Sequence, residues 1–198
     1  MGIGSDAAAN SCRSCKGAIN AVLNPKRTKQ QLHESSVRRR IADLFVEAEN
    51  TPINIADLFE RFDSRCFKTG KPLNIEDRDT WAIDHILPSR YLYPMCIENA
   101  ALLSTEANNN KRDSWPSKFY TNNQLLDLAR ITGANLGLIS NPTPIINHNI
   151  NVNNGVTRNL QVREASDLPK RIQEIKKIIE VYELADSLTP ENKKLLGF

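Results

Sequence analysis

Apolar residues recur at steps of three and four along several stretches of the chain, a spacing typical of helices that bury one face. Residues 31–49 show this spacing, and Pro52 ends it because proline has no amide hydrogen to donate. A second helix is predicted to begin after Asn54, a good N-cap. The apolar positions that define these two helices are Val37, Ile41, Leu44, Phe45, Ala48, Ile55, Leu58, Phe59 and Phe62.

The pattern changes in the middle of the chain to two short segments typical of β-strands. Residues 80–86 are dense in β-forming side chains, and residues 99–105 make a second short apolar run. A helix is predicted to follow from about Glu106 and to stop before Pro116. The expected order in this part of the chain is therefore strand, loop, strand, helix.

The rest of the chain is predicted to contain two more helices with a long loop between them. Residues 122–132 form the first, with Gly133 as a left-handed C-cap. Residues 134–157 are rich in asparagine and contain two prolines, which predicts loops or a short hairpin. The last helix, of about five turns, carries an apolar stripe. The stripe consists of Leu168, Ile172, Ile175, Ile179 and Tyr182.

These elements predict an α+β protein without internal repeats. The working core is expected at residues 54–133. A basic, helical segment, residues 1–53, precedes it. A loop-rich segment with the C-terminal amphipathic helix, residues 134–198, follows it. The simplest interpretation of this last segment is that its helix packs on its own domain. The more specific prediction is that the segment contributes to DNA specificity or to a dimer contact.

Composition narrows the class of protein. Of 198 residues, 40% are hydrophobic and 25% charged, which is ordinary globular usage and argues against disorder. No apolar run approaches the ~20 residues of a membrane-spanning helix, and the N-terminus has no secretory signal. We therefore expect a cytoplasmic protein without membrane contact. The 26 basic and 23 acidic residues leave a net charge of +3, so a strongly basic surface would have to be local.

One group of polar residues has the chemistry of phosphodiester hydrolysis. Asp84 is a hard oxygen ligand, and His85 carries an imidazole, whose unperturbed pKa lies near physiological pH. Asn99 opens the second strand, and Asn108 and Lys111 lie three residues apart on one face of the following helix. Asp84 and His85 taken alone would be interpreted as an ordinary hydrogen-bonded Asp–His pair on the surface. Their joint spacing with the other three residues favours a site in which a base activates water beside a divalent cation.

This spacing resembles the motif of the HNH nuclease family, also called the ββα-metal or His-Me finger. The resemblance covers about residues 80–120, with Asp84, His85, Asn99, Asn108 and Lys111 in order. The step of nine residues from Asn99 to Asn108 is similar to HNH domains of RNA-guided CRISPR effectors. The setting in a small chain is more similar to a type II restriction endonuclease.

The resemblance implies a role for each of these residues. His85 would be the general base that takes a proton from the attacking water, and Asp84 and Asn108 would hold one Mg²⁺. Asn99 would hydrogen-bond across the loop and fix the backbone that presents His85, while Lys111 is a candidate phosphate clamp. Asn108 departs from the histidine of many members. An amide oxygen suits Mg²⁺, with Mn²⁺ as a substitute, better than it suits a softer metal.

The geometry of a regular strand sets a condition on this assignment. Neighbouring side chains such as Asp84 and His85 point to opposite faces of a strand. For both to act on one phosphate, the strand must end or bulge at this point, and Pro88 favours an early end.

The N-terminal segment contains a local basic patch. On a helix such a run is usually a solvated face, but contact with DNA phosphates is favoured because charge neutralisation dominates nucleic-acid affinity. The asparagines of residues 145–159 could read adenine edges, although a plain loop is the simpler interpretation. The basic residues assigned to DNA binding are Lys26, Arg27, Arg38, Arg39 and Arg40.

Four cysteines raise the question of a structural zinc ion. Cys12 and Cys15 have the spacing of a zinc knuckle, whereas Cys66 and Cys96 lie thirty residues apart. The four cysteines are interpreted equally well as four unligated thiols and as the ligands of one shared zinc ion.

The sequence as a whole predicts a Mg²⁺-dependent DNA endonuclease, a type II restriction enzyme that acts on double-stranded DNA as a homodimer. The resemblance implies 5′-phosphate and 3′-hydroxyl products. The alternatives are a homing, nicking or toxin-type HNH nuclease with weaker sequence preference, and a non-catalytic, zinc-stabilised DNA-binding module.

Overall fold

The computed structural model of the protein describes residues 42–161 and 165–198. The chain divides into two compact units, Met1–Val37 and Arg38–Phe198, and every described residue belongs to the second. The predicted basic patch and the pair Cys12 and Cys15 lie outside the described residues. Of the first predicted helix, residues 42–49 are described; residues 42–47 are helical and residues 48–49 form a turn.

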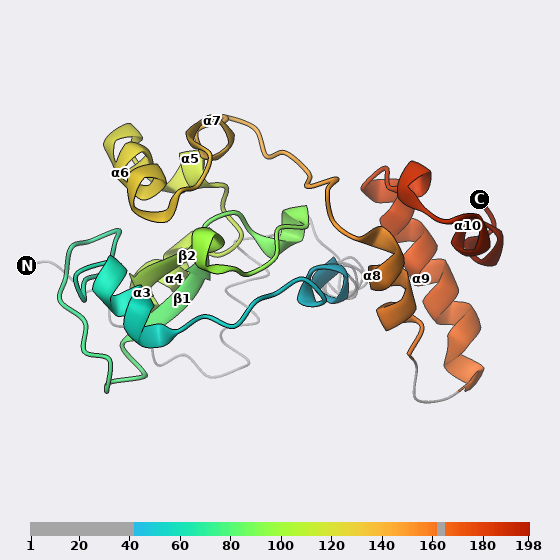
Figure 1. Ribbon diagram of the computed structural model, residues 1–198, viewed down its shortest axis with the longest axis horizontal. Helices are drawn as coiled ribbons and strands as arrows, with labels where there is room; N and C mark the ends of the chain where they lie inside the picture. Colours follow the sequence, from blue (N-terminus) through green and yellow to red (C-terminus); the bar gives the residue numbers. More distant parts are fainter. Residues whose placement is uncertain (1–41, 162–164) are drawn as a thin grey trace, which may run out of the picture. The chain divides into compact units, whose positions relative to one another are not determined.

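A two-stranded antiparallel sheet followed directly by a helix forms the middle of this unit (Figure 1). β1 (Trp81–His85) pairs with β2 (Ala100–Ser104), and the register places His85 opposite Ala100. α4 (Thr105–Lys111) begins where β2 ends, because Ser104 Oγ accepts a hydrogen bond from the Ala107 amide at 3.2 Å. The predicted order of strand, loop, strand and helix is confirmed, and the protein is of mixed α+β class.

The connection between the strands contains two short 3₁₀ turns, η2 (Ser89–Tyr91) and η3 (Ile97–Asn99). It ends at Asn99, whose carbonyl accepts a hydrogen bond from the Ile86 amide at 2.8 Å. The strand pairing therefore continues one residue beyond β1, and the chain then turns away at Leu87 and Pro88.

The sheet is held in place because β2 is fully buried. Ala100, Ala101, Leu102 and Leu103 are all 0% exposed. α3 (Ile55–Arg61) packs on this strand, with Asn54 as its N-cap and Leu58, Phe59 and Phe62 buried as predicted. Burial of such side chains, each worth about 1.5–3 kcal/mol, fixes the strand against the helix.

Further helices follow α4 in the order α5 (Pro116–Phe119), α6 (Asn122–Thr132) and α7 (Leu136–Ile139). α6 has the predicted bounds. Thr121 and Gln124 form a capping box at its start, and Gly133 ends it with a φ of 78°, which favours glycine.

The prediction of loops for residues 134–157 is confirmed for residues 140–151, which form neither a helix nor a strand, but it was wrong towards the two ends of the segment. This segment forms α7 and the start of α8 (Val152–Asn159). Asn135 and Asn151 are the N-caps of the two helices, and each side chain accepts a hydrogen bond from a backbone amide at 3.0 Å. Asparagine disfavours helix interiors but favours the position before the first turn, so the asparagines mark helix starts as well as loops.

The C-terminal part consists of η4 (Ala165–Asp167), α9 (Leu168–Val181), η5 (Ala185–Ser187) and α10 (Pro190–Leu196). α9 is the predicted amphipathic helix, at 14 residues shorter than five turns. Ile175, Ile178 and Ile179 on its apolar side are at most 2% exposed, and α9 contacts α8 and α10. The apolar stripe is thus covered by the chain itself.

Tyr182 and Gly155 connect the C-terminal helices to earlier parts of the unit. Tyr182 donates its hydroxyl to the Arg90 carbonyl at 2.7 Å. Gly155 in α8 packs against the Phe45 ring so closely that an added Cβ would lie 2.2 Å from it. Among the helices in the described ranges, none has the length and apolarity needed to cross a membrane.

Candidate active site

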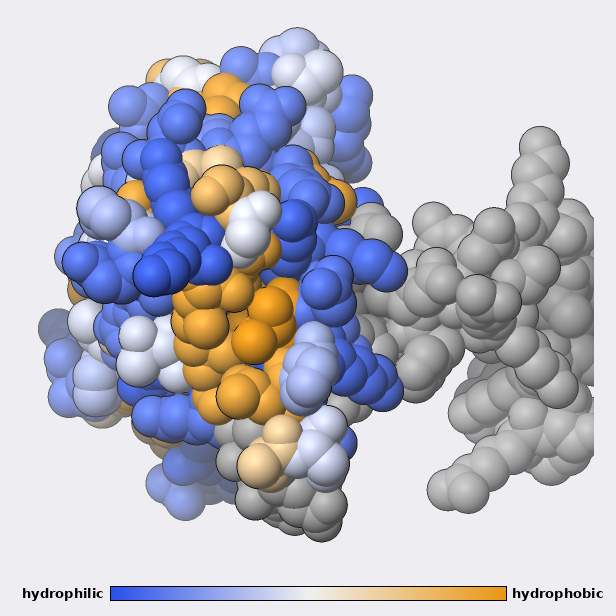
Figure 2. Space-filling model, turned by 90° about the vertical axis from the view of Figure 1, so that its right-hand side faces the viewer, coloured by the Kyte–Doolittle hydropathy of each residue, from blue (hydrophilic) through white to orange (hydrophobic). Residues whose placement is uncertain are grey.

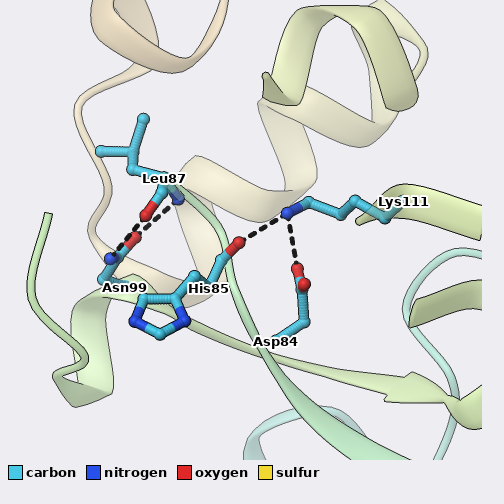
Figure 3. A network of polar contacts seen from close by, with 5 residues as sticks. All are labelled: Asp84, His85, Leu87, Asn99 and Lys111. Atoms are coloured by element: carbon cyan, nitrogen blue, oxygen red, sulfur yellow. Dashed lines mark hydrogen bonds and ion pairs between the residues drawn. The ribbon is translucent and has the colours of Figure 1, made fainter. Parts of the chain in front are cut away.

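An ion pair between Asp84 and Lys111 lies at the junction of β1 and α4 (Figure 3). Lys111 Nζ is 2.8 Å from Asp84 Oδ2, and the two side chains are 0% and 6% exposed. The same ammonium donates a hydrogen bond to the His85 carbonyl at 2.6 Å. The last residue of α4 is therefore fixed to the end of β1 by its charge.

The Asp84 carboxyl group carries a perturbed pKa. Burial raises its pKa to about 6, the attraction of the Lys111 ammonium opposes that rise, and the charge of Asp113 adds to it. Since a pKa of about 6 lies below neutral pH, Asp84 is ionised at pH 7, as both an ion pair and a cation ligand require.

His85 is the last residue of β1, and its imidazole points away from the Asp84 carboxylate (Figure 3). Burial, followed by the charge of Lys111, lowers the pKa of His85 to about 4. The ring is therefore neutral at pH 7, which is the form that accepts a proton. Its Nε2 atom is buried and has no hydrogen-bond partner among the described residues.

The alternation of strand side chains therefore holds at Asp84 and His85. The strand ends at His85, as the condition on the assignment required, but the two side chains still diverge in this conformation. The atoms that come together at one point are the Asp84 carboxylate, the His85 carbonyl and the Lys111 ammonium.

Asn99 holds the backbone that follows His85. Its Oδ1 accepts from the Leu87 amide at 2.7 Å, and its Nδ2 donates to the carbonyls of Leu87 at 3.0 Å and Pro94 at 2.8 Å (Figure 3). Asn99 is 7% exposed. These are the hydrogen bonds across the loop that the sequence predicted for Asn99, and they fix the path of the chain directly after the histidine.

Asn108 lies on α4 one turn before Lys111 and is half-buried. Residues three apart share a face of a helix, so the Asn108 amide projects from the same side of α4 as Lys111. The backbone carbonyl of Asn108 accepts a hydrogen bond from the Arg112 amide at 3.0 Å, and Arg112, the C-cap, has a positive φ of 51°. α4 therefore ends directly after Lys111.

The donor atoms at this point fit a hard divalent cation. The Asp84 carboxylate and the His85 carbonyl already surround one positive charge, that of Lys111. Carboxylate, carbonyl and amide oxygens are ligands of Mg²⁺, and Asn108 would supply the amide. Within the described part of the chain no three His, Cys, Asp or Glu side chains form a metal-binding group. Asp84 would therefore be the one carboxylate among the proposed ligands, beside the His85 carbonyl and the Asn108 amide oxygen.

Sequence reasoning missed two buried aromatic residues that carry a polar atom, and one of them, Tyr120, lies within the electrostatic influence of Asp84. Tyr120 is 5% exposed, and its pKa is raised well above the ordinary value, first by burial and then by the charge of Asp84. Its hydroxyl and the indole nitrogen of Trp115 are buried and make no hydrogen bond within the described residues. In the sequence, Trp115 marked only the end of a helix and Tyr120 carried no signal.

A pocket of about 210 Å³ lies beside α4, away from the residues predicted for catalysis. Lys68 in its wall is already engaged, since its Nζ donates to the Phe119 carbonyl at 2.6 Å and to Gln124 Oε1 at 3.1 Å. Lys71 is 3.8 Å from Glu106. The pocket is lined by Lys68, Thr69, Lys71, Glu106, Ala107, Asn110 and Phe119.

The two described cysteines lie in different surroundings, and neither forms a disulfide bond. Cys66 is fully buried beside Leu103 and Ala107. Burial would raise the pKa of its thiol, but hydrogen bonds with Thr69 and Ser104 outweigh burial and lower it. Burial raises the pKa of Cys96. Since Cys12 and Cys15 lie outside the described residues, the zinc site stays a prediction.

Comparisons with known protein families, with curated proteins and with solved structures find no match to this chain.

Proposed function

We propose that the protein is a Mg²⁺-dependent endonuclease that hydrolyses phosphodiester bonds of double-stranded DNA. The observation that carries the proposal is the junction of β1 and α4, where the buried Asp84 carboxylate and the His85 carbonyl hold the Lys111 ammonium, and the neutral His85 imidazole projects from the other side of the strand end. Together with the residue spacing, this strand-pair-and-helix unit supports an HNH, or ββα-metal, core.

His85 is the general base in this proposal. A base must be unprotonated at the working pH, and the lowered pKa of His85 meets that requirement. It would take a proton from a water molecule as that water attacks the phosphorus atom. Asn99 acts through His85, because its three hydrogen bonds hold the backbone that presents the ring.

Asp84 and Asn108 would hold the cation through a carboxylate and an amide oxygen. When bound, Mg²⁺ would neutralise the charge that develops on the phosphate during hydrolysis. Lys111, whose ammonium pairs with Asp84 in this structure, is the residue proposed to contact phosphate.

Several parts of the proposal concern the substrate and the assembly. The basic residues Lys26, Arg27 and Arg38 to Arg40 would contact the DNA backbone. A type II restriction enzyme that cuts both strands of a symmetric site would act as a homodimer.

Figure 2 shows an apolar area bordered by hydrophilic residues on the face turned to the viewer. Exposed large apolar residues of the C-terminal part are Val181, Leu195 and Phe198.

A plasmid cleavage assay tests the proposal. Purified protein with Mg²⁺ should convert supercoiled DNA to discrete linear fragments, and chelation of the metal should stop the reaction. A smear would favour the alternative of a nonspecific HNH nuclease. Intact plasmid together with retained DNA binding would favour the non-catalytic DNA-binding module.

A further inference from the structure

Lys111 has an unusual position for a residue expected to contact a phosphate. Its side chain is 0% exposed, and its ammonium group lies 2.8 Å from Asp84 Oδ2 (Figure 3). The second contact of the ammonium is again an oxygen atom, the His85 carbonyl, at 2.6 Å. Lys111 is thus a cation held by two oxygen atoms of the β1 end.

These oxygen atoms are of the kind that a hard divalent cation would use at the same point. Asp84 carries a single negative charge and is nearly buried. The described residues contain no cluster of three acidic, histidine or cysteine side chains that could hold the Lys111 ammonium and a divalent cation at the same time. A second cation at the carboxylate would meet the ammonium at close range and be repelled by it.

We propose that Lys111 and the divalent cation bind Asp84 in alternation. In the metal-free protein the Lys111 ammonium occupies the carboxylate and keeps it neutralised. When the divalent cation binds, the ammonium leaves Asp84 and becomes available to the DNA phosphate. This inference rests on the proposed nuclease function and gives Lys111 two successive partners in that same site, the Asp84 carboxylate and the DNA phosphate.

A lysine side chain is suited to this exchange. A buried carboxylate without a partner is costly, so Asp84 requires a positive charge even when no metal is present. The ammonium group supplies it as a single point charge on a flexible four-carbon stem, which can swing away by rotation about its bonds. Lys111 is also the last residue of α4, where the helical backbone ends.

Direct binding of Mn²⁺, followed by electron paramagnetic resonance at one fixed pH, tests the proposal without reference to catalysis. Lys111→Met should bind Mn²⁺ at least tenfold more tightly than the wild type, because the competing charge is gone. Lys111→Gln can still hydrogen-bond to Asp84 and should also bind Mn²⁺ more tightly than the wild type. It replaces the methionine variant in the experiment if that variant does not fold. Asp84→Asn combined with Lys111→Met should lose the binding.

Lys68→Met is the matched control. Lys68 is a partly buried lysine that, like Lys111, donates to a backbone carbonyl, but its partners are Phe119 and Gln124 rather than Asp84. This variant should bind Mn²⁺ as the wild type does. Thermal melting gives a second measurement: added Mg²⁺ should raise the melting temperature of Lys111→Met more than that of the wild type.

The outcomes separate two failures. Binding of Mn²⁺ by the wild type, with equal or weaker binding by both Lys111 variants, would overturn the alternation and leave the nuclease proposal standing. If the wild type and the single variants bind no more Mn²⁺ than the double variant does, the metal site itself is absent and the proposed function fails with it.

Discussion

The side-chain amide of Asn99 and the backbone of Leu87 are joined by two hydrogen bonds in opposite directions, at 2.7 and 3.0 Å. The Asn99 side chain thereby pairs with Leu87, directly after the last backbone pair of the two strands, in which the Ile86 amide donates to the Asn99 carbonyl. The backbone of Leu87 lies two residues beyond His85, so the position of the ring depends on an amide that precedes β2.

Asn99→Ala should therefore lower both stability and activity. The change removes three hydrogen bonds and leaves the buried Leu87 amide without a partner, which should cost on the order of 2–4 kcal/mol of unfolding free energy. Urea denaturation measures the loss, and single-turnover cleavage of the folded fraction should show a lower rate constant. Asn109→Ala, at an exposed position of α4, is the control and should stay within about 0.5 kcal/mol of the wild type.

His85→Ala should abolish cleavage while DNA binding survives. Loss of a general base slows the chemical step by about 10²–10⁴-fold but removes no group proposed to bind the DNA backbone. Plasmid cleavage and a gel-shift assay with the same DNA measure the two properties. His148→Ala, at an exposed position, should leave both unchanged. Normal turnover by His85→Ala would remove this residue from the mechanism.

Breaking the buried ion pair from one side should destabilise the protein strongly. Lys111→Met leaves the Asp84 carboxylate buried without its partner, which should cost about 3–5 kcal/mol. The double change Asp84→Leu with Lys111→Met should cost much less than the two single changes added together. Lys71→Met disrupts the exposed pair with Glu106 and should change stability by less than about 0.5 kcal/mol. Chemical denaturation of the wild type, Asp84→Leu, Lys111→Met and the double variant gives the coupling energy.

Asp84 and His85 should link stability to pH with opposite signs. The pKa of His85 is about 4 in the folded protein against an ordinary 6.5, so its contribution is fully present above pH 6.5 and lost as pH falls toward 4. The pKa of Asp84 is about 6 against an ordinary 3.8, so its contribution is present below pH 3.8 and lost as pH rises through 6.

The two contributions oppose each other between pH 4 and 6, and single variants should separate them. Relative to the wild type, Asp84→Asn should gain stability with rising pH in this window, and His85→Gln should lose it. Each slope should approach about 1 kcal/mol per pH unit. Unfolding free energies at half-unit steps of pH measure both, and curves parallel to the wild type would contradict the assigned pKa values.

Gly155→Ala should destabilise the contact between α8 and the helical residues 42–47. The added Cβ would lie 2.2 Å from the Phe45 ring, so the ring or the helix must move, at a cost of about 1–3 kcal/mol. Thermal unfolding measures the change. Asn154→Ala, at the exposed neighbouring position of α8, should be near neutral.

The sequence predicted those elements whose signals are local. The bounds of α6 follow from the Thr121 capping box and Gly133. The start of α4 follows from the Ser104 cap, but α4 ends at Lys111, earlier than the predicted stop before Pro116. Asn99 was assigned its hydrogen bonds through the family resemblance, and the bonds are present. α7 and α8 were missed because asparagine is common both in loops and at helix N-caps, and the composition of the segment does not distinguish the two.

The arrangement of the candidate site was predicted less well, because it depends on contacts between residues distant in sequence. Asp84 and Lys111 are 27 positions apart, and spacing alone shows that they can meet but not that they form a buried pair. Tyr120, at the end of α5, lies close enough to Asp84 for the carboxylate charge to raise its pKa, and this tertiary contact leaves no trace in the pattern of residues. The nuclease function, Mg²⁺ and the dimer stay predictions.

The hydrogen bond from Tyr182 to the Arg90 carbonyl spans 92 positions of the chain. During synthesis on the ribosome, the loop after His85 emerges well before residue 182. The connection between the two strands therefore receives this contact only after both strands have been made. A nascent chain that stops short of α9 can pair its strands, but it lacks the clamp on the turn that follows the histidine.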